Sequence, residues 1–96
     1  MTVGHDEATT IEVRGIELNV DMDYLNSWEA FKLIRKLDDD QCSQFDKLDY
    51  SFEFIQRVTG CDESQIVEYA GGEKAPATEV IAFTVEIIQK LQPLKN

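Results

Sequence analysis

The alternation of apolar and polar residues predicts a β-hairpin near the start of the chain, over residues 10–20. Arg14 and Gly15 interrupt the alternation and suit the loop of a two-residue hairpin. This loop pairs four apolar side chains on one face, Ile11 with Leu18 and Val13 with Ile16. Because a two-stranded ribbon is marginal alone, we expect the helix that follows Val20 to cover this face.

Residues 21–37 carry apolar side chains at the three- and four-residue spacing of an amphipathic helix. Asp21 suits the N-cap of this helix, and the basic residues of the segment fall in its last turns, where they complement the helix dipole. We expect one continuous helix here. It should bury its large apolar side chains Leu25, Trp28 and Phe31 against the hairpin.

Three more helices are predicted downstream. Residues 44–59 form the first, with Phe45 at the start of its apolar stripe and Gly60 as its left-handed stop. A capping-box pattern of Asp62 and Gln65 opens a short helix that ends at Gly71-Gly72. The last predicted helix covers residues 77–92 and stops before Pro93.

These elements predict a single domain of the α+β class, mostly α, in which an N-terminal β-hairpin packs on a bundle of about four helices. The expected divisions of residues 1–96 are a flexible tail over 1–9, the hairpin over 10–20 and a helical region over 21–92. A length of 96 residues is enough for one hydrophobic core.

The last predicted helix is apolar on more than one face. Its residues form two neighbouring stripes, one of Ile81, Val85 and Ile88 and the other of Val80, Phe83, Ile87 and Leu91. One stripe can serve the core of the monomer. The other is either buried as well, at the centre of a bundle, or left for a partner, and the sequence leaves both alternatives open.

The net charge of −10, from 19 acidic and 9 basic residues, disfavours direct binding to nucleic acid or to an anionic membrane. The sequence contains neither a long apolar run nor an export-type start, so we expect a cytoplasmic protein without membrane insertion. Cys42 and Cys61 are widely spaced, and two free thiols are the expected state in a reducing cytoplasm.

The sequence does not assemble a catalytic centre. Its one histidine, His5, falls in the predicted tail, and no base or orienting group accompanies either cysteine. The acidic run 38–40 lacks the glycine and the bidentate glutamate that a calcium loop requires. No glycine-rich phosphate loop is present. We therefore expect no enzyme activity, no catalytic residue, no cofactor and no metal.

The order of the elements resembles the tail assembly chaperones of long-tailed (siphovirus-type) phages and prophages. Four stretches carry the likeness: I-x-V-x-G-I-x-L-x-V over 11–20, D-x-D-Y-L-x-x-W-E-A-F-K-L-I-x-K-L-D-D over 21–39, F-I-Q-R-V-T-G over 54–60 and D-E-S-Q over 62–65. The final apolar helix completes the pattern. The resemblance implies a small protein of the host cytoplasm that acts during virion morphogenesis and is absent from the mature virion.

Such a chaperone would bind the tape measure protein, help to recruit tail tube subunits and form a homo-oligomer. The hypothesis for its self-association or client-binding residues is the stripe of Val80, Phe83, Ile87 and Leu91. Two alternative functions stay open. One is a non-enzymatic oligomeric adaptor or regulatory protein, and the other is an acidic nucleic-acid mimic that inhibits a DNA-binding protein.

Overall fold

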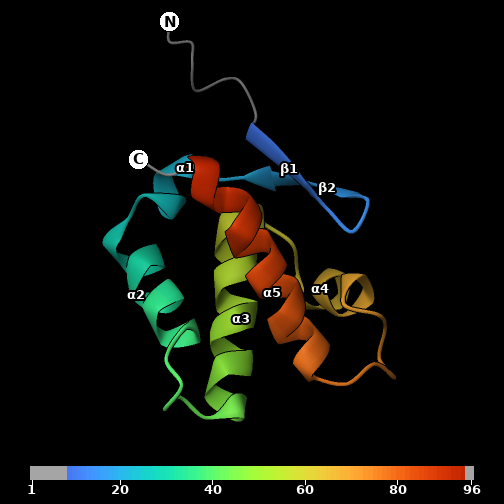
Figure 1. Cartoon of the computed structure of the whole chain (residues 1–96). Helices are drawn as coiled ribbons and strands as arrows, with labels where there is room; N and C mark the ends of the chain where they lie inside the picture. The colour runs from blue at the N-terminus through green and yellow to red at the C-terminus, as the bar shows by residue number, and fades with distance from the viewer. Residues whose placement is uncertain (1–8, 95–96) are drawn as a thin grey trace, which may run out of the picture.

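The computed structural model describes residues 9–94, and these form a mostly helical α+β fold in which an N-terminal hairpin packs on helices (Figure 1). The fold class predicted from the sequence is therefore confirmed. The elements are, in order, β1 (Thr9–Val13), β2 (Ile16–Val20), α1 (Met22–Leu25), α2 (Trp28–Leu37), α3 (Gln44–Thr59), α4 (Glu63–Tyr69), α5 (Thr78–Leu91) and the short 3-10 turn η2 (Gln92–Leu94).

The hairpin has the predicted register, with Ile11 opposite Leu18 and Val13 opposite Ile16. The two loop residues both have positive φ angles, 55° at Arg14 and 77° at Gly15, as a tight type I′ hairpin loop requires. Thr9 pairs with Val20, so it belongs to the sheet and not to the predicted tail. The rest of that tail, residues 1–8, lies outside the described residues.

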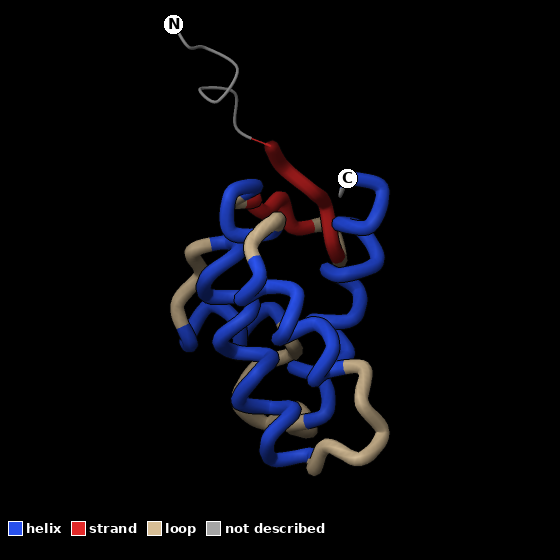
Figure 2. The backbone as a smooth tube through the Cα atoms, turned by 90° about the vertical axis from the view of Figure 1, so that its left-hand side faces the viewer, coloured by secondary structure: helices blue, strands red, loops and turns tan. Residues whose placement is uncertain are grey.

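The apolar face of the hairpin packs on α5 and α3 and not mainly on the helix that follows it, which corrects the expectation. β1 contacts α5 and β2 contacts α3, while the backbone N–H of Asp21 donates a 2.8 Å hydrogen bond to the carbonyl of Val58 at the end of α3. The strands thus lie across one end of the helices (Figure 2). Helices close in space, and not in sequence, cover the hairpin.

The predicted continuous helix over 21–37 is in fact two helices. Asp21 caps α1 by accepting from the backbone N–H of Tyr24, as expected. Ser27 then caps α2, because its hydroxyl accepts from the N–H of Ala30 at 3.2 Å and donates to the carbonyl of Tyr24 at 2.6 Å. A serine side chain that bonds nearby backbone groups competes with the helical ladder and starts a new helix instead.

The break changes which side chains of this segment enter the core. Leu25 is buried, as expected, but Trp28 and Phe31 are 64 % and 43 % exposed, so the prediction that they are core residues is wrong. In their place α2 buries Ala30, Leu33 and Leu37. Two of the three aromatic side chains of the segment therefore lie on its outer surface.

The remaining helices begin and end close to the predicted positions. Ser43 caps α3, Gly60 ends it with a φ of 79°, and both halves of the capping box of Asp62 and Gln65 are formed at α4. The core face of α3 differs from the prediction, since Phe45, the expected start of its apolar stripe, is 83 % exposed. Phe54 is fully buried.

The helices α3 and α5 form the centre of the fold. α2 packs on one side of α3, and α4 packs against α3 and α5 on the other side. α2 and α5 both contact α3 but have at most slight contact with one another. A hollow is consequently left between α2 and α5.

Candidate partner-binding surface

The two apolar stripes of α5 have the opposite roles to those that the sequence suggested. Val80 is 6 % exposed, Leu91 is 1 % exposed, and Phe83 and Ile87 are fully buried. These four side chains face inward because α5 packs on β1, α3 and α4 at once. The hypothesis that they form a partner or self-association surface is therefore wrong, since they belong to the core of the monomer.

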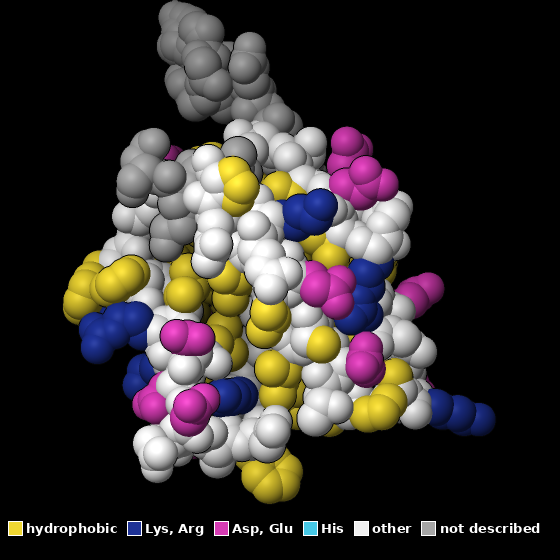
Figure 3. Space-filling view, in the orientation of Figure 1, with side chains coloured by type: hydrophobic (Ala, Val, Ile, Leu, Met, Phe, Trp, Pro, Cys, Tyr) yellow, Lys and Arg dark blue, Asp and Glu magenta, His cyan; other side chains and the backbone are white. Residues whose placement is uncertain are grey.

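The other stripe of α5 faces outward, toward α2. Val85 is 43 % exposed, and Ile81 and Ile88 are partly exposed. Together with α2, this side of α5 encloses an open hollow of about 350 Å³, which we call the α2–α5 groove. It is lined by the apolar residues Ile34, Leu37, Val85 and Ile88 and by the polar residues Arg35, Asp38, Gln89 and Gln92. Figure 3 shows hydrophobic side chains gathered between these two helices.

A second hollow of about 380 Å³ adjoins the groove on α2 and is lined by Trp28, Lys32, Arg35, Lys36 and Asp39. Arg35 lines both hollows, so the two are neighbours on α2. The rings of Trp28 and Phe31 lie 5.5 Å apart, and the Arg35 guanidinium lies 5.8 Å from the Phe31 ring centre. The surface therefore combines aromatic rings with cations.

Exposed apolar side chains are concentrated here and are not scattered over the described surface. Trp28, Phe31, Val85 and Phe45 are its large hydrophobic residues with high exposure, and the first three lie on α2 and α5. Phe45 is on the first turn of α3, outside both hollows. Contiguous exposed apolar groups beside polar ones are typical of sites that bind another protein.

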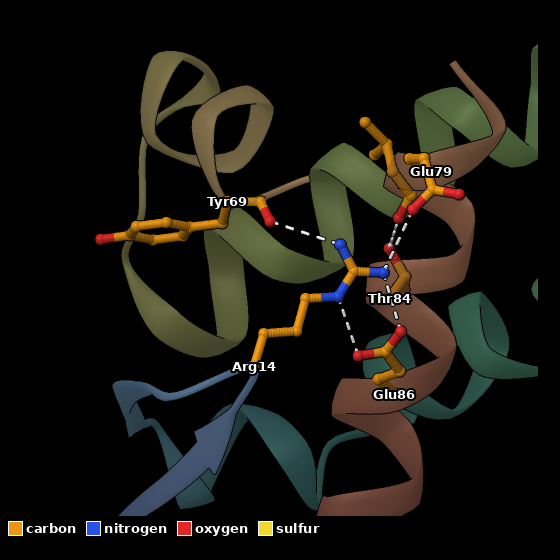
Figure 4. Close-up of polar contacts among 6 residues, drawn as sticks. Arg14, Tyr69, Glu79, Thr84 and Glu86 are labelled. Atoms are coloured by element: carbon orange, nitrogen blue, oxygen red, sulfur yellow. Dashed lines mark hydrogen bonds and ion pairs between the residues drawn. The ribbon is translucent and has the colours of Figure 1, made fainter. Parts of the chain in front are cut away.

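Ion pairs between Arg14 and two glutamates connect the hairpin loop to α5 (Figure 4). They favour the orientation of α5 in which Phe83 faces inward and Val85 faces outward. Arg14, in the hairpin loop, donates from Nε and Nη2 to the two carboxylate oxygens of Glu86 at 2.9 and 2.8 Å. It also donates to Glu79 Oε1 and to the carbonyl of Tyr69, both at 3.4 Å, and lies 5.4 Å from the centre of the Phe83 ring. One side chain thus links the hairpin, the end of α4 and the first and third turns of α5.

The hairpin pattern identifies Arg14 only as a loop residue and does not predict these ion pairs. A signal was available, because the positive φ angles of such loops favour Gly, Asn or Asp, and arginine accepts them at a cost in free energy. The paired carboxylates at Glu79 and Glu86 stand two helical turns apart, on one side of α5.

Replacement of Glu86 by Gln is expected to lower the free energy of unfolding at pH 7 by about 0.5–1 kcal/mol. The effect stays this small because the Glu86 side chain is 39 % exposed and solvent screens the pair. Urea unfolding measures it, with Glu73→Gln in an exposed loop as the control that should change nothing.

The same contact makes part of the stability depend on pH. The hydrogen bond from Arg14 lowers the pKa of the Glu86 carboxyl below its ordinary value of 4.5, although burial acts in the opposite direction. The stabilisation is therefore complete above that value and is lost as the pH falls through the lowered pKa. The difference in stability between wild type and Glu86→Gln should therefore shrink as the pH falls through the lowered pKa, and a difference that stays constant on acidification would contradict this assignment.

The described residues offer little other chemistry. They contain no group of three or more His, Cys, Asp or Glu side chains arranged to hold a metal ion. Within the same part of the chain, none of the helices is long and apolar enough to cross a membrane. Cys42 and Cys61 are free thiols, and His5 lies outside the described residues.

Known proteins give no further guide to this surface. No protein-family model, curated protein or solved structure matches the chain. Its function has to be inferred from the exposed side chains and from the order of elements in the sequence.

Proposed function

We propose that the chain is a tail assembly chaperone of a long-tailed phage or prophage. In this role it binds the tape measure protein, keeps it soluble and helps to recruit tail tube subunits around it. It acts in the host cytoplasm as a homo-oligomer and is absent from the mature virion. The resemblance of residues 11–91 to such chaperones supports the proposal at the level of sequence.

The observation that carries the proposal is the exposed apolar surface of α2 and α5 on a strongly charged protein. A chaperone for a long helical client needs apolar side chains that accept the apolar face of a helix. The α2–α5 groove offers Ile34, Val85 and Ile88 for that purpose. A net charge of −10 keeps a complex of such surfaces dissolved. The two properties suit the binding of an aggregation-prone partner.

Co-expression with the product of the longest neighbouring reading frame, which under this proposal is the tape measure protein, tests the proposal. We expect the tape measure protein to be insoluble alone, and to become soluble and co-purify when this chain is present. A tape measure protein that stays insoluble, beside a monodisperse form of this chain, would contradict the proposal. That result would favour an adaptor that uses the same surface for another partner.

A further inference from the structure

The outward side of α2 is positively charged, although the chain as a whole is strongly acidic. Lys32, Arg35 and Lys36 lie within five consecutive positions and account for three of the nine basic residues. All three are exposed, and they line one hollow together with Trp28. We call these four residues the basic–aromatic face.

The cations of this face have no carboxylate partner within the described part of the chain. Ion pairs between described side chains are made by Arg14 and Arg57, and not by Lys32, Arg35 or Lys36. Lys36 Nζ instead lies 5.4 Å from the centre of the Tyr50 ring. Such contacts with rings hold a cation in place and leave its charge available.

The nearest carboxylates mark one end of the face and do not neutralise it. Asp38 and Asp39 follow the last turn of α2, and Asp39 Oδ1 accepts a 2.9 Å hydrogen bond from the backbone N–H of Gln41. Glu29, at the other end of α2, is paired with Arg57 of α3 at 3.0 Å. Between these two ends α2 carries no other carboxylate, although Asp39 itself lines the same hollow as the three cations.

We propose that the basic–aromatic face and the adjoining α2–α5 groove bind an acidic amphipathic helix of a partner protein. Apolar side chains of that helix would fill the groove, and its Asp and Glu side chains would pair with Lys32, Arg35 and Lys36. Trp28, with 64 % of its surface exposed, provides the kind of anchor that dominates protein interfaces. The inference rests on the proposed function only for the natural source of the helix, which would be the tape measure protein.

Charge complementarity separates this occupant from the others. A basic helix would be drawn to the chain by its net charge of −10 but would meet three cations at this face. A second copy of the chain that docked through the same face would bring three cations against three, so the homo-oligomer of the proposed function would use another surface. An acidic helix gains the most favourable electrostatic energy at the basic–aromatic face, because the charges there are opposite to its own.

Two synthetic helical peptides of about 16 residues test the inference, since peptides of that length are near the limit of helix stability in water. Both carry Leu at the same positions and lack Trp, but one has Glu and the other Lys beside the leucines. Trp28 is the only tryptophan of the chain, so its fluorescence reports binding directly. We expect the Glu peptide to bind at least about tenfold more tightly than the Lys peptide, with a preference that shrinks as salt is added.

The double variant Lys32→Glu/Arg35→Glu should lose that preference. Its control is Lys74→Glu/Lys90→Glu, which changes the net charge equally at two exposed positions outside both hollows. Equal or tighter binding of the Lys peptide, binding of neither peptide, or the same loss in the control would overturn the inference. So would self-association that the Lys32/Arg35 reversal abolishes, because the face would then belong to a second copy.

The same variants keep this inference distinct from the proposed function. If Lys32→Glu/Arg35→Glu still co-purifies with the tape measure protein as well as wild type does, the acidic client helix is wrong and the chaperone proposal stands. If wild type prefers the Glu peptide but never solubilises the tape measure protein, the chaperone proposal fails and the acidic preference stands.

Discussion

Replacement of Phe83 by Ala is expected to lower the free energy of unfolding by about 3–5 kcal/mol. Phe83 is fully buried on α5. The centre of its ring lies 6.1 Å from the centre of the Tyr69 ring and 5.4 Å from the Arg14 guanidinium. The truncation removes buried apolar surface and leaves a cavity beneath the hairpin loop. A loss of this size is a large part of the stability of about 5–15 kcal/mol that is typical of small proteins.

The matched substitution on the surface is Trp28→Ala, for which we expect a change below about 1 kcal/mol. It removes a larger side chain, but one that is 64 % exposed on α2. Urea unfolding followed by circular dichroism compares the two variants without relying on tryptophan fluorescence. A cost for Trp28→Ala equal to that of Phe83→Ala would place Trp28 in the core and remove it from the partner-binding surface.

The features predicted well from the sequence are those that neighbouring residues determine. The hairpin register follows from alternation around Arg14-Gly15, and the stop of α3 follows from a glycine at Gly60. The start of α4 follows from Asp62 and Gln65, whose side chains and backbone N–H groups satisfy one another locally. Such signals act over a few residues, so one stretch of sequence contains all the information.

The roles of the two stripes of α5 could not be predicted in this way. Both stripes are apolar and both have helical spacing, so the sequence of α5 does not distinguish them. The choice depends on β1 and α3, which lie far away in sequence, and on the preceding helix α4, all of which pack against α5. Arg14 contributes to that choice through Glu79 and Glu86, and its partners are likewise distant in sequence.

The sequence contains one signal that indicates the exposure of Trp28. Ser27 is a favoured N-cap residue, and a new helix start there changes which positions of the segment share a face. The apolar spacing over residues 21–37 is continuous, however, and it predicts one helix across Ser27. The candidate surface therefore depends on both the break at Ser27 and the packing of α2 on α3.

Val85→Asp is expected to reduce binding of the tape measure protein at least about tenfold while the chain stays folded. Val85 is 43 % exposed in the α2–α5 groove, so a charge there stays hydrated in the free protein. In a complex the same carboxylate would be buried against an apolar side chain without a partner, which is costly. Valine and aspartate have similar helix propensities, so α5 itself should be little affected.

Client binding through the α2–α5 groove is tested by the amount of tape measure protein that co-purifies with Val85→Asp and with a matched control. Gln56→Asp is that control, because it adds the same charge at an exposed position of α3 outside the groove. We expect Gln56→Asp to retain the client as wild type does and Val85→Asp to lose most of it, with equal circular dichroism spectra for the two variants. Full retention of the client by a folded Val85→Asp variant would show that the α2–α5 groove is not the binding surface.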